Sequence, residues 1–182
     1  MDKANTHAAI IRHAHEKDYE TIGTLHAESW RRAYRGILAD EYLDNDLAGE
    51  RKAHWAGKMA GLKKNEFVLI AERSGEPVGF IAVMDRPEAG YDALIDNLHV
   101  RPDQKGLGTG SLLMRAAATE LQCSGRRSVY LWVLKGNTPA EGFYISRGAR
   151  TLDSDRVDFG GKMVEQTRFV WDALDPLLQT ES

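Results

Sequence analysis

The chain has 182 residues, of which 42% are hydrophobic and 28% are charged, and its net charge at pH 7 is −3. This composition can supply one hydrophobic core, and the length is short for two domains, so a single globular domain is predicted. The slightly acidic balance argues against a protein whose main partner is nucleic acid or an anionic membrane.

The cysteines, the histidines and the apolar runs bear on the location of the protein and on metal binding. Cys123 is the only cysteine, residues 1–18 lack the charged-then-apolar pattern of a secretion signal, and no apolar run approaches the roughly 20 residues of a membrane span. A cytoplasmic protein is therefore predicted. The six histidines form no H-E-x-x-H pattern and have no second cysteine to join, so no metal site is predicted.

Hydrophobic periodicity divides the chain into helices and strands. Apolar residues recur at helical spacing in the N-terminal third, whereas β-rich runs dominate the middle. The predicted elements, in chain order, are a strand over 9–14, helices over 19–37 and about 40–59, a hairpin over 67–85 with its turn at 74–77, a strand over 93–100, a helix over 112–124, a strand over 128–134, a helix over 138–147, and strands over 149–153 and 164–174. The order β-α-α-β-β-β-α-β-α-β-β predicts one mixed α/β sheet domain over 8–172, with short flexible termini.

A glycine-rich turn joins the strand over 93–100 to the following helix. Gly106, Gly108 and Gly110 alternate just before that helix begins. The first N–H groups of a helix are unpaired and lie at the positive end of its dipole, and glycine removes the Cβ atoms that would keep a phosphate away from them. The turn is therefore a candidate anion site, with a merely flexible turn as the alternative.

Other phosphate-binding motifs do not fit this turn. A P-loop requires Gly-Lys-Ser/Thr, and the "GGKM" stretch has Met163 where the hydroxyl should be. A dinucleotide-binding turn is disfavoured because Ser111 stands at the position of its third glycine. The catalytic-loop and metal-binding motifs of protein kinases are missing as well.

Two segments together resemble the GCN5-related N-acetyltransferases (GNAT), which transfer an acetyl group from acetyl-CoA to an amine. The family's first signature is Gln/Arg-x-x-Gly-x-Gly/Ala after a strand, and here the sequence reads "KGLGTG" over 105–110 after "LHVRP". The second signature, Asn-x-x-Ala-x-x-Phe-Tyr-x-x-x-Gly, is present over 137–148. The resemblance covers about 8–172. Lys105 departs from the usual Gln or Arg, because it keeps the charge but lacks the planar fork.

The resemblance implies the single-domain GNAT (acyl-CoA N-acyltransferase) fold, a mixed and mostly antiparallel sheet flanked by helices. It also implies that acetyl-CoA enters a gap between the strands over 93–100 and 128–134, and homodimers are common in the family. The cofactor-binding residues that the resemblance implies are Leu98, His99 and Val100 for the pantetheine arm, Lys105, Gly106, Leu107, Gly108, Thr109, Gly110 and Ser111 for the pyrophosphate, and Asn137, Phe143 and Tyr144.

Acid and base residues can be assigned only in part. The resemblance implies that Tyr144 protonates the leaving thiolate, with a purely structural aromatic as the alternative. A primary amine must lose a proton before it attacks, and Asp96 is the candidate base because period two places it on one sheet face with Leu94 and Leu98. His99, Glu28 or a chain of waters are alternatives, and Asp96 could instead position the amine.

His26, Trp30 and Tyr34 recur at i, i+4 and i+8 on the first helix and are candidates for contacting the acceptor, with packing in the core as the alternative. The segment 158–169 could close the pocket from the other side. Asn137 could equally be an ordinary helix N-cap.

The leading hypothesis is acetylation of a small-molecule amine, such as a polyamine, an amino acid or a xenobiotic amine. A protein N-terminal or lysine acetyltransferase and a non-catalytic CoA-binding sensor are the alternatives.

Overall fold

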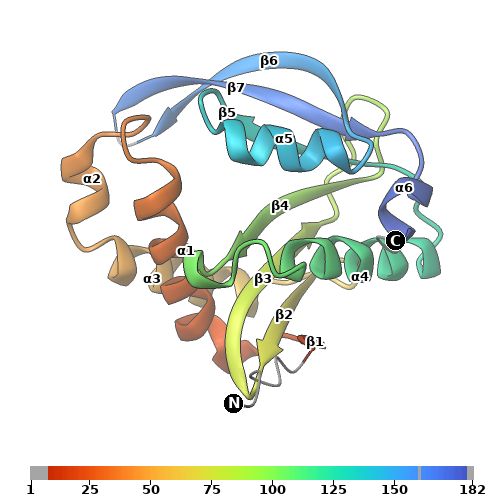
Figure 1. Ribbon diagram of the computed structural model, residues 1–182, viewed down its shortest axis with the longest axis horizontal. Coiled ribbons are helices and arrows are strands. Elements are labelled where there is room, and N and C mark those ends of the chain that lie inside the picture. The colour runs from red at the N-terminus through yellow and green to blue at the C-terminus, as the bar shows by residue number, and fades with distance from the viewer. Residues whose placement is uncertain (1–7, 160, 180–182) are drawn as a thin grey trace, which may run out of the picture.

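Seven strands form one sheet in the computed structural model, which describes residues 8–159 and 161–179 (Figure 1). The strand order is β1-β2-β3-β4-β5-β7-β6, and every neighbouring pair is antiparallel except β4 and β5. The strands are β1 Ile10–His13, β2 Phe67–Arg73, β3 Glu76–Met84, β4 Ala93–Val100, β5 Val129–Leu134, β6 Arg150–Phe159 and β7 Lys162–Trp171. The predicted mixed, mostly antiparallel sheet is confirmed.

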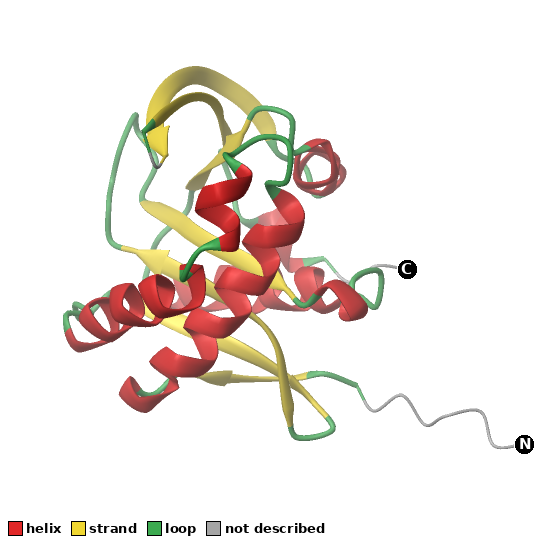
Figure 2. Ribbon diagram, turned by 90° about the vertical axis from the view of Figure 1, so that its left-hand side faces the viewer, coloured by secondary structure: helices red, strands yellow, loops and turns green. Residues whose placement is uncertain are grey.

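Helices cover both faces of the sheet. The α-helices are α1 Tyr19–Ala33, α2 Asp40–Asp44, α3 Leu47–Ala60, α4 Thr109–Cys123, α5 Thr138–Ser146 and α6 Asp175–Leu178, with short 3-10 turns at Glu16–Asp18 and Pro102–Gln104. Apolar residues of α1 and α3 pack on one face of β2 and β3, and those of α4 pack on the other face. Figure 2 views the molecule from the side on which α1, α2 and α3 lie.

The predicted helix over 40–59 is in fact two helices. The chain leaves the helical conformation at Asn45, and Asp46 begins α3 by accepting a hydrogen bond from the Gly49 N–H at 3.0 Å. An Asp side chain that accepts a backbone N–H hydrogen bond favours the start of a new helix over the continuation of an existing one. Hydrophobic periodicity alone did not indicate this break. The first helix is also shorter than predicted, because it ends at Ala33.

The predicted hairpin turn is observed, whereas the strand predicted over 149–153 is too short. The β2–β3 hairpin turns at Ser74 and Gly75, which both have positive φ angles of 54° and 81°, as a tight hairpin turn requires. β6 is longer than predicted because most of its side chains are exposed and polar, which leaves no apolar pattern to detect. The predicted flexible termini fall partly on residues 1–7 and 180–182, which lie outside the described residues.

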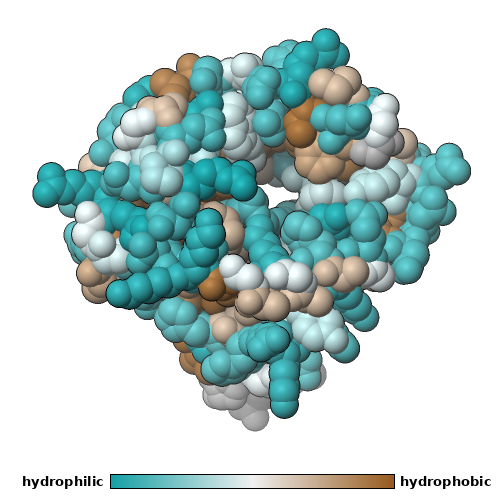
Figure 3. Space-filling view, turned by 180° about the vertical axis from the view of Figure 1, so that it is seen from behind, coloured by the Kyte–Doolittle hydropathy of each residue, from teal (hydrophilic) through white to brown (hydrophobic). Residues whose placement is uncertain are grey.

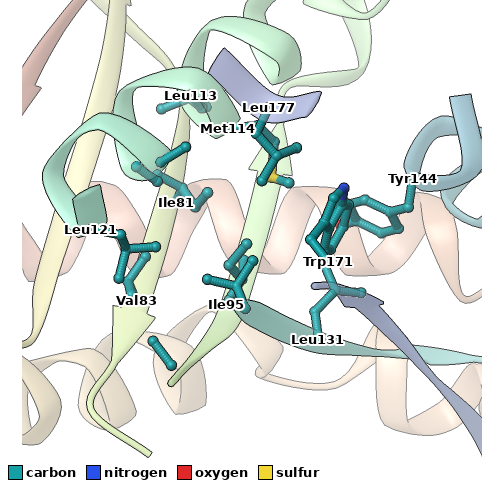
Figure 4. Packing of buried hydrophobic residues seen from close by; sticks show 14 of the residues in the cluster. Ile81, Val83, Ile95, Leu113, Met114, Leu121, Leu131, Tyr144, Trp171 and Leu177 are labelled. Atoms are coloured by element: carbon teal, nitrogen blue, oxygen red, sulfur yellow. The ribbon is translucent and has the colours of Figure 1, made fainter. Parts of the chain in front are cut away.

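The gap that positions the site opens between β4 and β5. These strands pair only at Ala93 with Val129 and at Leu94 with Tyr130, and they diverge beyond those pairs. A large apolar cluster under α4 fixes both strands, since Ile95 and Leu131 contribute to it (Figure 4). The sheet is therefore continuous at one end of β4 and split at the other.

None of the helices within 8–159 and 161–179 combines the length and the apolar character needed to cross a lipid bilayer.

Candidate active site

A cavity of about 680 Å³ occupies the gap between β4 and β5. Its walls come from α1, β4, the glycine loop over 105–111, β5, α5 and the β6–β7 hairpin. Seen from behind, the surface is hollowed near the middle of the molecule, where these elements surround the gap (Figure 3). Most residues that the sequence nominated as cofactor-binding line this cavity, and Leu107 is the exception.

The backbone of β4 faces alternately toward β3 and toward the gap. The Arg101 N–H donates to the Val78 carbonyl at 2.8 Å, and a Cβ on Gly79 would lie 2.8 Å from the His99 carbonyl oxygen. Arg101 and His99 therefore turn their backbone groups toward β3, and the alternation of an antiparallel ladder turns those of Leu98 and Val100 toward the gap. The expectation that the His99 backbone faces the pantetheine arm is thus wrong, and the contact of Leu98 and Val100 with that arm stays a prediction.

A β-bulge places Asp96 at the point where β4 leaves β5. Ile95 pairs with Val83 and Asn97 pairs with Ala82, so Asp96 has no partner across the ladder. Such an extra residue breaks the period of two. Leu94 and Asp96 consequently face α3, whereas Leu98 packs in the cluster under α4. The prediction that Asp96 shares a face with both leucines is wrong for Leu98.

The Asp96 carboxylate has one engaged and one open oxygen. Lys58 of α3 and the side-chain amide of Asn97 both donate to Oδ2, the amide at 2.6 Å. Within the described part of the chain, no side chain or N–H donates to Oδ1. Asp96 lines the cavity, and its side chain is 28% exposed. The open oxygen can accept a proton or a hydrogen bond from a bound amine.

The glycine loop leads directly into the N-terminus of α4. Gly106 and Gly108 have φ angles of 77° and 75°, and Gly108 precedes α4 without any side-chain cap, so the first amides of that helix are open to a ligand. A Cβ on Gly110 would lie 3.2 Å from the ring of Phe143. The loop therefore depends on glycine for its backbone conformation and for the space beside α5.

Two arginines that sequence reasoning missed contact the first turn of α4. The Arg73 guanidinium donates to the Thr109 hydroxyl at 3.2 Å, and Arg147 donates to the Ser111 hydroxyl and lies 4.6 Å from the Phe143 ring centroid. Arg73 ends β2 and Arg147 follows α5, and neither position belongs to a motif that sequence alone would single out. Their contacts tie two hydroxyls of the first turn of α4 to the rest of the domain.

Two tyrosines meet in the wall near α5. Tyr144 packs against Trp171 (Figure 4) and also against Phe169. Burial raises the pKa of its hydroxyl. Tyr34 of α1 also lines the cavity; burial raises its pKa to about 12, and its hydroxyl bonds to the Asn137 side chain. Asn137 precedes α5 but makes no side-chain cap hydrogen bond, so its side chain links α5 to α1 rather than capping the helix.

Of the three acceptor candidates on α1, Trp30 and Tyr34 line the cavity and His26 does not. His26 is 1% exposed, its Nδ1 accepts from the Trp55 indole at 2.9 Å, and its ring stacks on His99 at 4.6 Å. It is therefore a core residue, and the expectation that it contacts the acceptor is wrong. The helical spacing that suggested one continuous face cannot distinguish the core from the cavity wall.

His99 is a poor proton acceptor in this setting. Its Nδ1 lies 2.9 Å from the Ser29 hydroxyl, and burial lowers its pKa to about 3, with a smaller contribution from Lys105. A base this weak stays neutral at physiological pH and has little driving force to take a proton from an amine. Glu28, the other side chain considered as a base, is exposed and lies outside the cavity wall.

The far wall of the cavity contains polar groups that sequence reasoning did not identify. Glu88 accepts from the Tyr130 hydroxyl at 3.1 Å and pairs with the buried Arg168 at 3.0 Å, while Arg168 lies 4.5 Å from the Trp132 ring centroid. The predicted closing segment over 158–169 contributes Phe159 and Gln166 to this wall. Across residues 8–159 and 161–179, no cluster of three or more His, Cys, Asp and Glu side chains could hold a metal ion.

Comparisons with known proteins agree with this geometry. The profile of the Acetyltransferase (GNAT) family matches residues 24–149. An uncharacterized N-acetyltransferase, YuaI, of Bacillus subtilis is 25% identical over 92% of this chain and 95% of its own length. A spermidine N(1)-acetyltransferase of Thermoplasma acidophilum is 23% identical over 82% of this chain and 92% of its own.

The crystal structure of the PaiA N-acetyltransferase of Thermoplasma acidophilum, in complex with coenzyme A, has the same fold. Its TM-score is 0.70 at 22% identity, over 87% of this chain and 98% of that protein. The match of the family profile, the split between β4 and β5 and the glycine loop at the start of α4 lead to one conclusion. The chain belongs to the GNAT family and is an acetyl-CoA-dependent N-acetyltransferase.

Proposed function

We propose that this enzyme acetylates a primary amine of a small molecule, such as a polyamine, an amino acid or a xenobiotic amine. One observation carries the proposal: a single cavity of about 680 Å³ contains both the glycine loop and the side chains of the far wall. Cavities of this size are typical of small-molecule sites. The relative named as a spermidine acetyltransferase supports an acceptor of this class.

Backbone groups form the part of the site that would hold acetyl-CoA. The loop amides would bind its diphosphate, and Leu98 and Val100, whose backbone groups face the gap, would pair with the pantetheine arm. When bound, acetyl-CoA supplies the activated acetyl group. The Leu98 N–H has no partner strand at this depth, since β5 pairs with β4 only at Ala93 and Leu94. It can therefore stabilise the negative charge that forms on the carbonyl oxygen during attack.

Proton removal from the acceptor is assigned to Asp96. An amine with an ordinary pKa of about 10 is mostly protonated at neutral pH, so it must lose a proton to attack. Asp96 lines the cavity, its Oδ1 accepts no hydrogen bond from the described residues, and this oxygen can take that proton directly or through water. Lys58 and Asn97 hold the other oxygen and so fix the orientation of the carboxylate.

Tyr144 is assigned to the leaving thiolate. Because burial raises its pKa, the hydroxyl stays protonated and can donate a hydrogen bond to a thiolate beside it. Tyr34 stands close enough to raise the pKa of Tyr144 further, and its own hydroxyl is engaged by Asn137. Because Asn137 already holds the hydroxyl of Tyr34, donation to the leaving thiolate is assigned to Tyr144.

An assay of thiol release from acetyl-CoA over a panel of amines and peptides tests this function. We expect release with one or more polyamines, amino acids or other small amines and little with peptides. Release only with peptide N-termini or lysines would favour a protein acetyltransferase of the same fold. Binding of acetyl-CoA without release for any acceptor would favour a sensor. The cytoplasmic location and a homodimer stay predictions that this assay does not address.

A further inference from the structure

Three charged side chains line the part of the cavity away from the glycine loop, which we call the acceptor end. Among the described residues these are Arg86, Glu88 and Asp96, and Arg86 is exposed just beyond β3. The positive partners of the two carboxylates, Lys58 and Arg168, do not line the cavity. A ligand at the acceptor end therefore meets the carboxylates themselves rather than the groups that pair with them.

Glu88 is held in place by two partners. Its Oε2 accepts from the Tyr130 hydroxyl at 3.1 Å, and its Oε1 pairs with Arg168 at 3.0 Å. Arg168 is itself fixed, because its side chain is only 8% exposed and also pairs with Asp153 at 2.9 Å. Each carboxylate oxygen can accept more than one hydrogen bond, and the Glu88 side chain is 44% exposed. Glu88 can therefore accept a further hydrogen bond from a donor in the cavity.

Glu88 and Asp96 occupy separate positions on one face of the sheet. Leu94 pairs with Tyr130 across β4 and β5, both side chains belong to the core under α1 and α3, and the Tyr130 hydroxyl holds Glu88. Asp96, which also faces α3, lies two residues beyond Leu94, roughly 6 Å along a strand. An amine placed at Asp96 therefore leaves Glu88 available to a second group of the same molecule.

Aromatic rings make up much of the remaining wall of this cavity. The faces of such rings attract ammonium groups, and the rings also cover methylene groups. An apolar chain with a positive charge at each end therefore matches this wall and its two carboxylates better than a chain that ends in a carboxylate. The rings are those of Trp30, Tyr34, Tyr130, Trp132 and Phe159.

We propose that Glu88 determines acceptor specificity by binding a second cationic group of the acceptor, while Asp96 takes the proton from the amine that is acetylated. The inference rests on the proposed function, since it takes a small amine to bind in this cavity. It narrows the acceptors to diamines and polyamines. It disfavours amino acids, because their carboxylate would be repelled by Glu88 and Asp96, with Arg86 as the one opposite charge in this part of the wall.

Steady-state kinetics with linear diamines, and with monoamines of the same chain lengths, test the proposal. The wild-type protein should have a kcat/KM about 30-fold higher for the best diamine than for the matching monoamine, as expected for one charge-assisted hydrogen bond. Glu88→Gln should bring the two values to within about threefold by slowing the diamine alone. The amide can still accept from Tyr130, and Asp153 still pairs with Arg168.

Glu41→Gln is the matched control. It makes the same change on an exposed residue of α2 outside the cavity wall, so the ratio should stay at its wild-type value. A second measurement needs no variant. Because Glu88 is partly exposed, the wild-type preference for the diamine should shrink as salt is added, and a preference that is independent of salt would overturn the inference.

The other outcomes separate the inference from the proposed function. Equal kcat/KM values for diamines and monoamines in the wild-type protein would overturn the inference and leave acetylation of small amines intact. An unchanged ratio in Glu88→Gln would also overturn it, and turnover of the monoamine by that variant shows that it is folded. A preference for amino acids that is lost in Arg86→Ala would assign the second group to Arg86 instead. Acetylation of peptides but of no small amine would contradict the proposed function.

Discussion

The two ends of the main cavity are built from different parts of the chain. The end near α4 consists of backbone groups and glycines, namely the amides after Gly108 and the gap-facing groups of Leu98 and Val100. The other end has side chains that are held by partners outside the cavity wall, as Asp96 is by Lys58 and Glu88 is by Arg168. The first end needs a particular backbone conformation, whereas the second needs particular side chains.

This difference predicts where substitutions should have the largest effect. Gly110→Asp would place a Cβ 3.2 Å from the Phe143 ring and a carboxylate beside the amides that would hold the diphosphate. Steric conflict and charge repulsion then act together, and we expect CoA affinity to fall about 1,000-fold. Calorimetric titration with CoA measures this effect.

Gly57→Asp provides the control for that prediction. Gly57 is an exposed helical glycine with open space around its Cβ position, so the same substitution there should leave CoA affinity unchanged. A similar loss in both variants would indicate a general effect of charge or folding. Wild-type affinity in Gly110→Asp would show that the diphosphate does not lie on this loop.

Substituting Tyr144 and Tyr34 in turn tests which of the two hydroxyls serves the leaving thiolate. Tyr144→Phe keeps the ring that packs on Trp171 but removes the hydroxyl, so we expect kcat to fall about 100-fold while the affinity for CoA is retained. Tyr34→Phe removes a hydroxyl that Asn137 already engages and should lower kcat only a few-fold. Steady-state kinetics of both variants with one good acceptor make the comparison. The reverse order of effects would assign the thiolate to Tyr34.

The same difference explains how much could be predicted from sequence. A site built from backbone groups can be recognised in the sequence, because positive φ angles and close approaches of the backbone require glycine. Gly106 and Gly108 have positive φ angles, and Gly110 lies close to Phe143. The strand over 93–100 was predicted at its observed bounds, since an apolar run ending before proline has few alternatives. The backbone conformation of the glycine loop and the position of β4 could thus be predicted from the sequence.

The end of the cavity that contains Asp96 and Glu88, where the acceptor would bind, has no such pattern in the sequence. Lys58 and Asp96 are 38 residues apart in sequence and meet only when α3 packs against β4. The bulge at Asp96 cannot be deduced from period two, which assigned Leu98 to the wrong face. His26 and Trp30 share a helical face, yet only Trp30 reaches the cavity, because His99 fills the space beside His26.

Asp96 gives a smaller expected effect than Gly110 or Tyr144, and it tests the part of the cavity where the acceptor amine would bind. Asp96→Asn should lower kcat/KM at neutral pH about tenfold, because the amide cannot take a proton from the acceptor. The loss should shrink as pH rises toward the ordinary amine pKa of about 10, where more of the acceptor is already neutral. A pH profile of kcat/KM with a defined amine measures this. A loss that stays the same at every pH would assign proton removal to another group or to water.

Asp96→Asn also removes the charge that pairs with Lys58, whose side chain is only 19% exposed, so an unpaired ammonium is a second cause of lost activity beside the missing base. The double variant Asp96→Asn/Lys58→Met separates the two causes. If Asp96 takes the proton, the double variant is as slow as Asp96→Asn, and Lys58→Met alone keeps most of the activity because Asn97 still orients the carboxylate. Recovery of activity in the double variant would instead mean that Asp96 serves only to neutralise Lys58, and the acceptor end would then need no side-chain base.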